Sequence, residues 1–220
     1  MNSLFYTPIG VAGVCDHYKG VGTFYTSDQH FGHTNIIGLC DRPFRNADEM
    51  GDYIMAQWNS LVGPTDTVWV LGDVALGNTA LELERIKGLN GVKHLVAGNH
   101  DRCWEHHKPK RRRGWLQRYL DAGFVSVSSY HNTTIGAHQV GLCHFPYQGD
   151  SHPEDRYREY RPIDRGGWLI HGHIHEKRRV DRQGRMINVG VDVWGFKPVP
   201  ESVLETIINN TPQPTHRRKV

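Results

Sequence analysis

Three histidines occupy alternate positions in the stretch LIHGHIH of residues 169–175. Side chains on an extended segment repeat every two residues, so His173 and His175 can point at one place. Neutral imidazole is the commonest metal ligand in proteins, which makes the pair a candidate chelate. On its own, a pair of this kind would more often belong to a solvated, histidine-rich loop. For His171 we expect a structural role, or a role that supports a ligand, in place of direct ligation.

Four further clusters of polar residues each follow an apolar run directly. Apolar runs of this length predict buried strands, and ligands at the carboxyl ends of such strands gather at one edge of a sheet. Together with the histidine pair, the clusters therefore predict one site that holds two metal ions. Imidazole and carboxylate groups together suit the borderline metals Mn, Fe, Zn, Co and Ni, among which we favour Mn. The clusters are Asp28-Gln29-His30, Gly72-Asp73, Gly98-Asn99-His100-Asp101 and Cys143-His144.

The elements that must position these clusters alternate between strand and helix as far as Ala97, which is typical of an α/β fold with mostly parallel strands. Asn46 and Glu49 resemble a capping pair, and apolar residues at helical spacing predict a helix from there to Leu61. Past residue 123, short runs separated by Gly, Asn and Pro predict a mostly β half. We predict a second helix at 81–87 and strands at 23–27, 67–71, 93–97, 124–129, 133–135, 139–143, 168–171 and 186–189.

The remaining segments predict loops and termini. Residues 31–35 and 146–167 have the composition of loops, and the second is of a length that is often functional. Residues 182–184 fit a hairpin turn. We expect residues 1–22 to form an irregular arm or an extra strand of the same domain, residues 23–208 the main domain, and residues 209–220 a flexible basic tail.

The composition limits the kind of protein. With 220 residues and 38% hydrophobic residues, the chain can bury the core of one domain. The four cysteines are scattered without a Cys-x-x-Cys pair, which argues against a disulfide framework and predicts a reducing, cytoplasmic setting. The first residues lack the layout of a secretory signal, and no segment approaches the roughly 20 apolar residues that span a bilayer. We therefore expect a soluble protein without a membrane partner.

The ordered clusters between residues 28 and 175 resemble the signature of the calcineurin-like metallophosphoesterase superfamily, in particular its small single-domain bacterial and phage members. The resemblance implies a four-layer α/β/β/α sandwich of two mixed sheets. It also implies seven metal ligands in two sets with one bridging residue, namely Asp28, His30 and His175, then Asn99, His144 and His173, and Asp73 between them.

The chemistry implied by the resemblance is metal-dependent hydrolysis of a phosphoester. A hydroxide shared by the two ions would be the nucleophile, because metal binding lowers the pKa of water to about 7. His100 would donate a proton to the leaving oxygen or stabilise the charge of the transition state. Asp101 would orient His100 through its other ring nitrogen.

The resemblance favours phosphodiesters as substrates, cyclic nucleotides (2′,3′ or 3′,5′) in particular. A nuclease acting on single-stranded or structured nucleic acid is one alternative, and a phosphomonoesterase or nucleotide-polyphosphate hydrolase is another. A binding module on the same fold, such as the phosphoesterase-like scaffold subunit of retromer, is disfavoured because no motif residue is missing.

Residues around the motifs are candidates for binding the substrate. His33 could line the substrate cleft or be a simple loop histidine. Arg42 and Arg45 could grip a phosphate oxygen through their guanidinium groups, or pair with Asp41 or Asp48 near the start of a helix.

A basic run at residues 108–113 holds five cations in six residues. Residues 102–118 as a whole hold seven Lys/Arg and one Glu, so the formal net charge of +3 hides a local patch of +6. The run could follow a nucleic-acid backbone or remain a solvated loop. Trp104 and Trp115 bracket it and could stack on bases or pack in the core.

Overall fold

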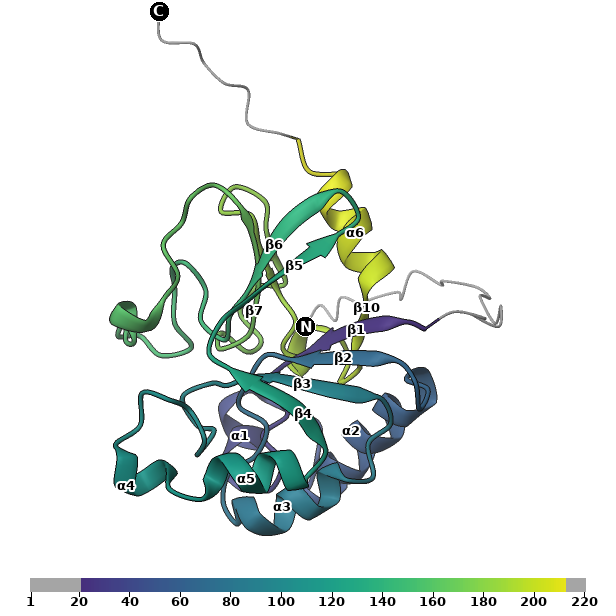
Figure 1. Ribbon diagram of the computed structural model, residues 1–220, viewed down its shortest axis with the longest axis vertical. Coiled ribbons are helices and arrows are strands. Elements are labelled where there is room, and N and C mark those ends of the chain that lie inside the picture. The colour runs from purple at the N-terminus through teal and green to yellow at the C-terminus, as the bar shows by residue number, and fades with distance from the viewer. Residues whose placement is uncertain (1–20, 213–220) are drawn as a thin grey trace, which may run out of the picture.

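Two five-stranded sheets face each other in the computed structural model, which describes residues 21–212. In the first sheet, strands β1 to β4 run parallel to one another and β10 pairs antiparallel with β1 (Figure 1). The strand order is β10-β1-β2-β3-β4. The bounds are β1 Thr23–Thr26, β2 Thr67–Val70, β3 Val92–Val96, β4 Phe124–Ser128 and β10 Val199–Pro200.

The second sheet is also mixed, with the order β5-β6-β7-β9-β8. The β6-β7 and β7-β9 pairs are parallel, whereas β5-β6 and β8-β9 are antiparallel. An isolated parallel bridge between Ser27 and Gly190 ties the end of β1 to the chain that follows β9. The bounds are β5 His131–Ile135, β6 His138–Leu142, β7 Trp168–His171, β8 Val180–Asp181 and β9 Met186–Asn188.

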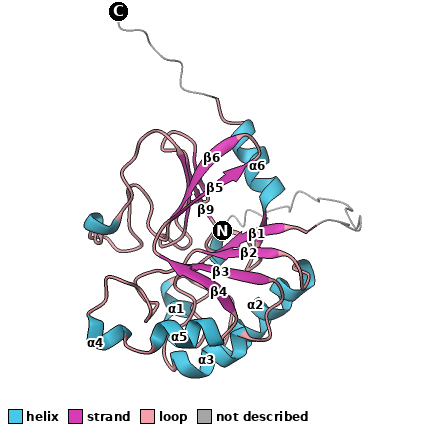
Figure 2. Cartoon of the chain, in the orientation of Figure 1, coloured by secondary structure: helices cyan, strands magenta, loops and turns pink. Residues whose placement is uncertain are grey.

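Most helices lie along the outer face of the first sheet (Figure 2), and α6 contacts β10, β1 and β5 where the two sheets meet. None of the helices between residues 21 and 212 combines the length and apolar content that a bilayer crossing requires. The α-helices are α1 Thr34–Leu39, α2 Ala47–Leu61, α3 Thr79–Ile86, α4 Pro109–Arg112, α5 Trp115–Asp121 and α6 Glu201–Asn209, with 3₁₀ turns at Arg158–Tyr160 and Val191–Val193.

Alternation along the strands sends side chains into two cores. From β2, Val68 and Val70 pack with Trp58 of α2, in the core between the first sheet and its helices. Tyr25 of β1 and Ile170 of β7 lie in the core between the sheets, which α6 closes with its own buried side chains. The predicted α/β sandwich of two mixed sheets with helices is therefore confirmed, and α6 lies where it closes the core between the sheets.

The predicted strands all form, each within two residues of its expected bounds, and so do the two predicted helices. Asn46 caps α2 by accepting a hydrogen bond from the backbone N–H of Glu49, as expected of the first half of a capping pair. Four α-helices were not predicted, namely α1, α4, α5 and α6. Residues 31–35 were expected as a loop, yet α1 begins at Thr34, and the basic run contains α4.

The predicted arm and tail lie largely outside the described residues. At the C-terminal boundary, α6 extends to Asn209, and the Thr211 hydroxyl donates to the carbonyl of Ile207 while Thr211 itself is buried. The first residues of the expected tail are therefore packed against α6.

Candidate metal centre

Each predicted ligand follows the carboxyl end of a strand. Asp28 and His30 come after β1, Asp73 after β2, and Asn99 after β3. His144 follows β6, and His173 and His175 follow β7 in the second sheet. Since all seven residues are at most 7% exposed, the two sheets bring them together in the interior.

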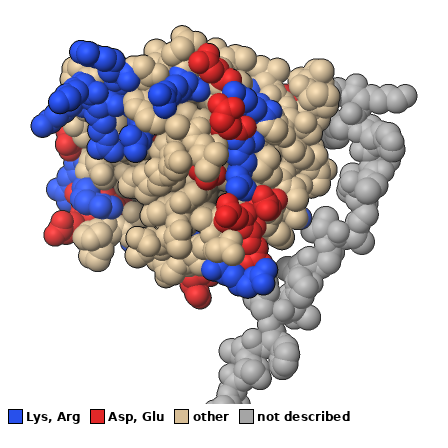
Figure 3. Space-filling view, turned by 90° about the horizontal axis from the view of Figure 1, so that it is seen from below, with Lys and Arg blue, Asp and Glu red and all other residues tan. Residues whose placement is uncertain are grey.

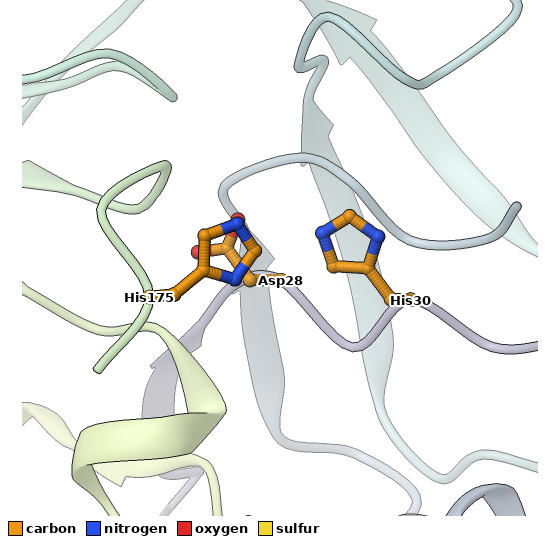
Figure 4. Close-up of side chains that lie close together, drawn as sticks. All are labelled: Asp28, His30 and His175. Carbon is orange, nitrogen blue, oxygen red and sulfur yellow. The ribbon is translucent and has the colours of Figure 1, made fainter. Parts of the chain in front are cut away.

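One group joins the two sheets through Asp28, His30 and His175 (Figure 4). One ligand atom from each of these residues lies within 4.8 Å of the others. The backbone N–H of His173 donates a hydrogen bond to the Asp28 carboxylate, with 3.0 Å between N and Oδ2. This bond holds the turn after β7 against the turn after β1. A side chain at Gly172 would collide with Asp28 Oδ2, so glycine is required for this approach.

A second group contains Asp28, Asp73 and His144. The Asp73 carboxylate of this group also approaches the first group, because its Oδ2 is 3.3 Å from His144 Nε2 and 3.8 Å from His30 Nε2. Gly72, with φ of +88°, allows the sharp turn that presents Asp73, and its backbone passes directly beside Gly98 and His144.

The centre contains many buried polar atoms that lack a hydrogen bond, and these atoms test whether the residues fit a metal ion. Buried polar groups are nearly always hydrogen-bonded, so a cluster of exceptions needs a partner from outside the chain. Six of the seven predicted ligands contribute such an atom: His30 Nε2, Asp73 Oδ2, Asn99 Oδ1, His144 Nε2, His173 Nε2 and His175 Nδ1. Imidazole nitrogens and carboxylate or amide oxygens are metal ligands, and the donor set fits divalent cations.

Neighbouring groups orient the histidines as ligation requires. His144 Nδ1 lies 2.7 Å from the carbonyl of Leu71, which assigns the proton to Nδ1 and leaves the Nε2 lone pair toward Asp73. Burial opposes the charged form of His144, but the Asp73 carboxylate outweighs it and raises the pKa to about 9, so a metal ion bound at Nε2 would take the place of the second proton. Burial lowers the pKa values of His30 and His173, so these two rings are neutral and ready to bind metal.

The backbone at the centre is strained. Asp28, His30, Asp73, His173 and His175 all have φ between +49° and +71°, in the left-handed region that non-glycine residues rarely adopt. Such conformations persist where surrounding contacts determine them, and they concentrate at functional sites. These residues make up five of the nine described non-glycine residues with positive φ.

His100 lies at the solvent side of the centre. Its side chain is 40% exposed, and its Nε2 is 3.9 Å from Asp73 Oδ2. It is therefore the one residue of the motifs that reaches the ligands from the surface, a suitable position for contacting a substrate.

Asp101 does not orient His100 as predicted. Both of its carboxylate oxygens accept other hydrogen bonds: Oδ2 from the backbone N–H groups of Asp73 and Gly98, and Oδ1 from the N–H of Val74 and the hydroxyl of Tyr119. Burial and the neighbouring Asp73 raise the pKa of Asp101 to about 6. Asp101 therefore links two turns, the one that carries Asp73 and the one that carries Asn99.

Arg42 is not free to bind a phosphate, contrary to the prediction. Its side chain is fully buried, and it forms a two-pronged ion pair with Asp192, with Nε–Oδ1 at 2.7 Å and Nη2–Oδ2 at 2.8 Å. The remaining guanidinium N–H groups donate to the carbonyls of Asp28 and Gln29 and to the sulfur of Met50. Arg42 thus supports the backbone of the first motif.

The other candidate substrate residues lie in different settings. Arg45 is 85% exposed and pairs with Glu49, rather than with Asp41 or Asp48. His33 is half-buried beside the centre, with its Nδ1 3.3 Å from His30 Nδ1. His171 is buried, and its Nδ1 lies 2.7 Å from the carbonyl of Gly172, which agrees with the expected structural role.

Sequence reasoning missed two carboxylates beside the ligands. Asp150 Oδ2 is 3.3 Å from His173 Nε2, and Asp192 Oδ2 is 3.6 Å from His175 Nδ1. The thiol of Cys40 also lies beside His175 and Asp192. The position of Asp150 in the long loop after the fourth motif was the only signal for it, and nothing local marked Asp192.

The comparisons with known proteins agree with this geometry. The model of the calcineurin-like phosphoesterase superfamily domain matches residues 23–205. The gene 66 protein of Mycobacterium phage L5 is 35% identical over 185 residues, which cover 79% of this chain and 87% of that protein. The gene 66 protein of Mycobacterium phage D29 is 34% identical over 197 residues, covering 85% of this chain and 96% of that protein.

A solved structure is also similar. A protein of unknown function from Aquifex aeolicus superimposes with a TM-score of 0.65 at 26% identity, covering 86% of this chain and all of that one. The family match extends over most of the chain and includes all seven predicted ligands. The chain therefore belongs to the calcineurin-like phosphoesterase superfamily.

Proposed function

We propose that this chain is a phosphodiesterase that requires two divalent metal ions. The observation that carries the proposal is the cluster of six buried ligand atoms without hydrogen bonds. Asp28, His30 and His175 would hold one ion, Asn99, His144 and His173 the other, and Asp73 would bridge them. The position of Asp73 Oδ2 between His30 and His144 supports the bridging role. Of the suitable metals, we favour Mn.

Ions bound there would lower the pKa of water and neutralise charge on the phosphoryl oxygens. The residues of the chain supply the rest of the chemistry. His100, exposed beside Asp73, would donate a proton to the oxygen that leaves phosphorus. His33, half-buried beside His30, would contact the substrate from the side of the first motif.

Cyclic nucleotides are the substrates that we propose to test first, because they are compact phosphodiesters that bring a single phosphate to the centre. Nucleic acid and phosphomonoesters or nucleotide polyphosphates are the alternatives. The scattered cysteines support a cytoplasmic setting, and the three described ones are free thiols.

The test is a hydrolysis assay of the metal-loaded protein over cyclic nucleotides, linear diesters and monoesters. His100→Ala is expected to lower kcat by about 10²- to 10⁴-fold, because a positioned proton donor is worth that much. His138→Ala serves as a matched control, since His138 lies at the start of β6 and contacts Asn209 away from the centre. Faster turnover of monoesters than of diesters, or full activity in excess chelator, would contradict the proposal.

A further inference from the structure

A hollow in the surface of about 580 Å³ lies next to the metal centre and takes no part in the proposed reaction. It is bordered by the chain between β4 and β5, by the long loop after β6, and by Glu105 and His106. The volume falls within the range of pockets that bind small ligands. Its walls combine aromatic rings with guanidinium groups, through Tyr130, Tyr160, Arg161 and Arg165.

The aromatic side chains of the hollow can stack on a planar ring. Tyr130 is 44% exposed, and its hydroxyl donates to Asn132, which fixes the ring at the rim. Among the other lining residues, the rings of His106 and Tyr160 lie 4.6 Å apart, and Tyr160 packs on Trp104. Rigid rings of this kind bind bases without sequence preference, because every base has a π face.

The guanidinium groups make part of the wall positive. The Arg161 side chain is 7% exposed, with Nη2 bound to Asp155 and to the carbonyl of Arg156, while its Nε has no hydrogen bond. Arg165 is exposed and forms no ion pair with any residue of the described chain. Glu105 and Glu159 also line the hollow, so the charges of its own lining balance, and the unpaired positive charge lies on Arg165 and on the adjoining basic run.

The basic run continues directly from the hollow. Arg112 Nη1 donates to the carbonyl of Glu105 at 3.0 Å, which holds α4 against the rim. Lys108, Lys110, Arg111 and Arg113 are exposed, and no carboxylate between residues 21 and 212 pairs with them. Figure 3 shows Lys and Arg side chains gathered at the upper left with few acidic neighbours, on the side where α4 lies in Figure 1.

The hollow and the metal centre share an aromatic wall. Tyr157 and Phe145 contact the ring of His173, and both also lie beside Tyr160, which lines the hollow. Cys143 in the hollow precedes the ligand His144. A ligand that lies in the hollow is therefore separated from the centre by the thickness of a few side chains.

From these observations, we propose that the hollow and the basic run form one binding path for single-stranded nucleic acid. A base stacks in the hollow, and phosphates of the same strand contact the cations at 108–113. Only a single strand offers unstacked bases, so the aromatic hollow disfavours a duplex. The path would place a neighbouring phosphodiester at the metal centre, a step that rests on the proposed function, whereas the binding itself does not.

The experiment measures binding to metal-free protein by fluorescence anisotropy, using a labelled 12-nucleotide oligo(U) over a range of salt concentrations. For single strands, the slope of log K against log salt is about −0.7 for each phosphate contacted. Lys110→Ala/Arg111→Ala is expected to make the slope less steep by about 1.4. Arg182→Ala/Lys197→Ala removes two exposed cations elsewhere and is the matched control.

The hollow is tested separately by Tyr130→Ala, which is expected to weaken binding by about 5- to 100-fold with little change in the salt slope, because it removes a stacking ring and no charge. Tyr130→Phe retains the ring and is expected to restore the affinity. Circular dichroism of each variant checks that the fold is intact.

Three outcomes would overturn the proposal: no binding of the oligonucleotide, equal effects of the two double substitutions, or binding of a mononucleotide as tight as that of the strand. The proposed function is judged independently, by hydrolysis of small diesters. If the wild-type protein hydrolyses them but does not bind the strand, the binding path alone is wrong. If it binds the strand and hydrolyses no ester, the proposed function alone is wrong.

Discussion

Asp101 accepts four hydrogen bonds and so fixes the two turns that present Asp73 and Asn99. In Asp101→Asn, an amide nitrogen would face backbone N–H donors and leave some of them unpaired. We expect the free energy of unfolding to fall by about 2–4 kcal/mol, since each unsatisfied buried group costs about 1–3 kcal/mol. Urea denaturation measures the change. Unaltered stability with a large loss of kcat would instead restore the role of orienting His100.

A second prediction at this scale concerns pH. Burial and the nearby His131 lower the pKa of His94, whose ring stacks on Trp69 and whose Nδ1 contacts the Ser126 hydroxyl at 2.8 Å. The folded protein therefore binds fewer protons at His94 than the unfolded chain does. The contribution of His94 to the free energy of unfolding is fully present above its unfolded pKa of about 6.5, and it is lost as the pH falls below that value.

The substitution His94→Gln removes this titration. Between about pH 6.5 and 5, we expect the variant to lose less free energy of unfolding per pH unit than the wild type. Thermal or urea denaturation across the range measures both slopes. Parallel slopes would show that His94 makes no contribution to acid sensitivity.

The metal ligands could be predicted from local sequence signals, whereas ion pairs between residues far apart in the sequence could not. An apolar run followed by Asp73 or His144 marks the end of a strand within a few residues. Arg42, by contrast, pairs with Asp192, which is 150 positions away, and no pattern near either residue indicates the other. The side-chain type of Arg42 suggested phosphate binding, and only tertiary structure shows that its guanidinium group is fully occupied.

At the scale of elements, the cap of α2 gives a direct test of the sequence signal. The Asn46 side chain accepts from the N–H of Glu49 at 2.9 Å. We expect Asn46→Ala to lower the free energy of unfolding by about 1 kcal/mol, because the variant loses the N-cap. Gln57→Ala, on the same helix and without a side-chain hydrogen bond within the described chain, is the control. Equal effects of the two substitutions would contradict the role of the cap.

The helices that escaped prediction lacked such signals. α1 is six residues long, and its N-cap residue His33 makes no side-chain capping bond. α5 begins after Gly114 in a strongly basic stretch, and α6 after Pro200, again without a capping side chain. In α6, the spacing of Leu204 and Ile208 by four residues was a usable signal, since both are buried on one face.

At the scale of the molecule, the centre connects the two sheets. Asp28 and Asp73 come from the first sheet, and His144 and His175 from the second. Bound metal therefore stabilises the packing of one sheet on the other as well as the site. At a free metal concentration 100 times Kd, binding to the folded state adds about 2.7 kcal/mol to the free energy of unfolding.

This linkage predicts the effect of removing the metal. We expect a chelator to lower Tm by several degrees, because about 1 kcal/mol shifts Tm by roughly 2–4 °C in chains of this size. Differential scanning calorimetry with and without Mn²⁺ measures the shift. His144→Ala should abolish the response to Mn²⁺, whereas His138→Ala should retain it, and an unchanged response in His144→Ala would exclude that residue as a ligand.

The left-handed backbone of five candidate ligands lowers the stability of the fold at positions that metal binding requires. A non-glycine residue in this region costs on the order of 1–3 kcal/mol, and glycine at His30 or His175 would remove that cost together with a buried ring nitrogen that lacks a hydrogen bond. In a laboratory selection for heat resistance alone, carried out in chelator, we expect glycine to spread at these positions. The selected variants would be more stable to heat and would lack activity. Metal in the growth medium should instead favour retention of the ligands.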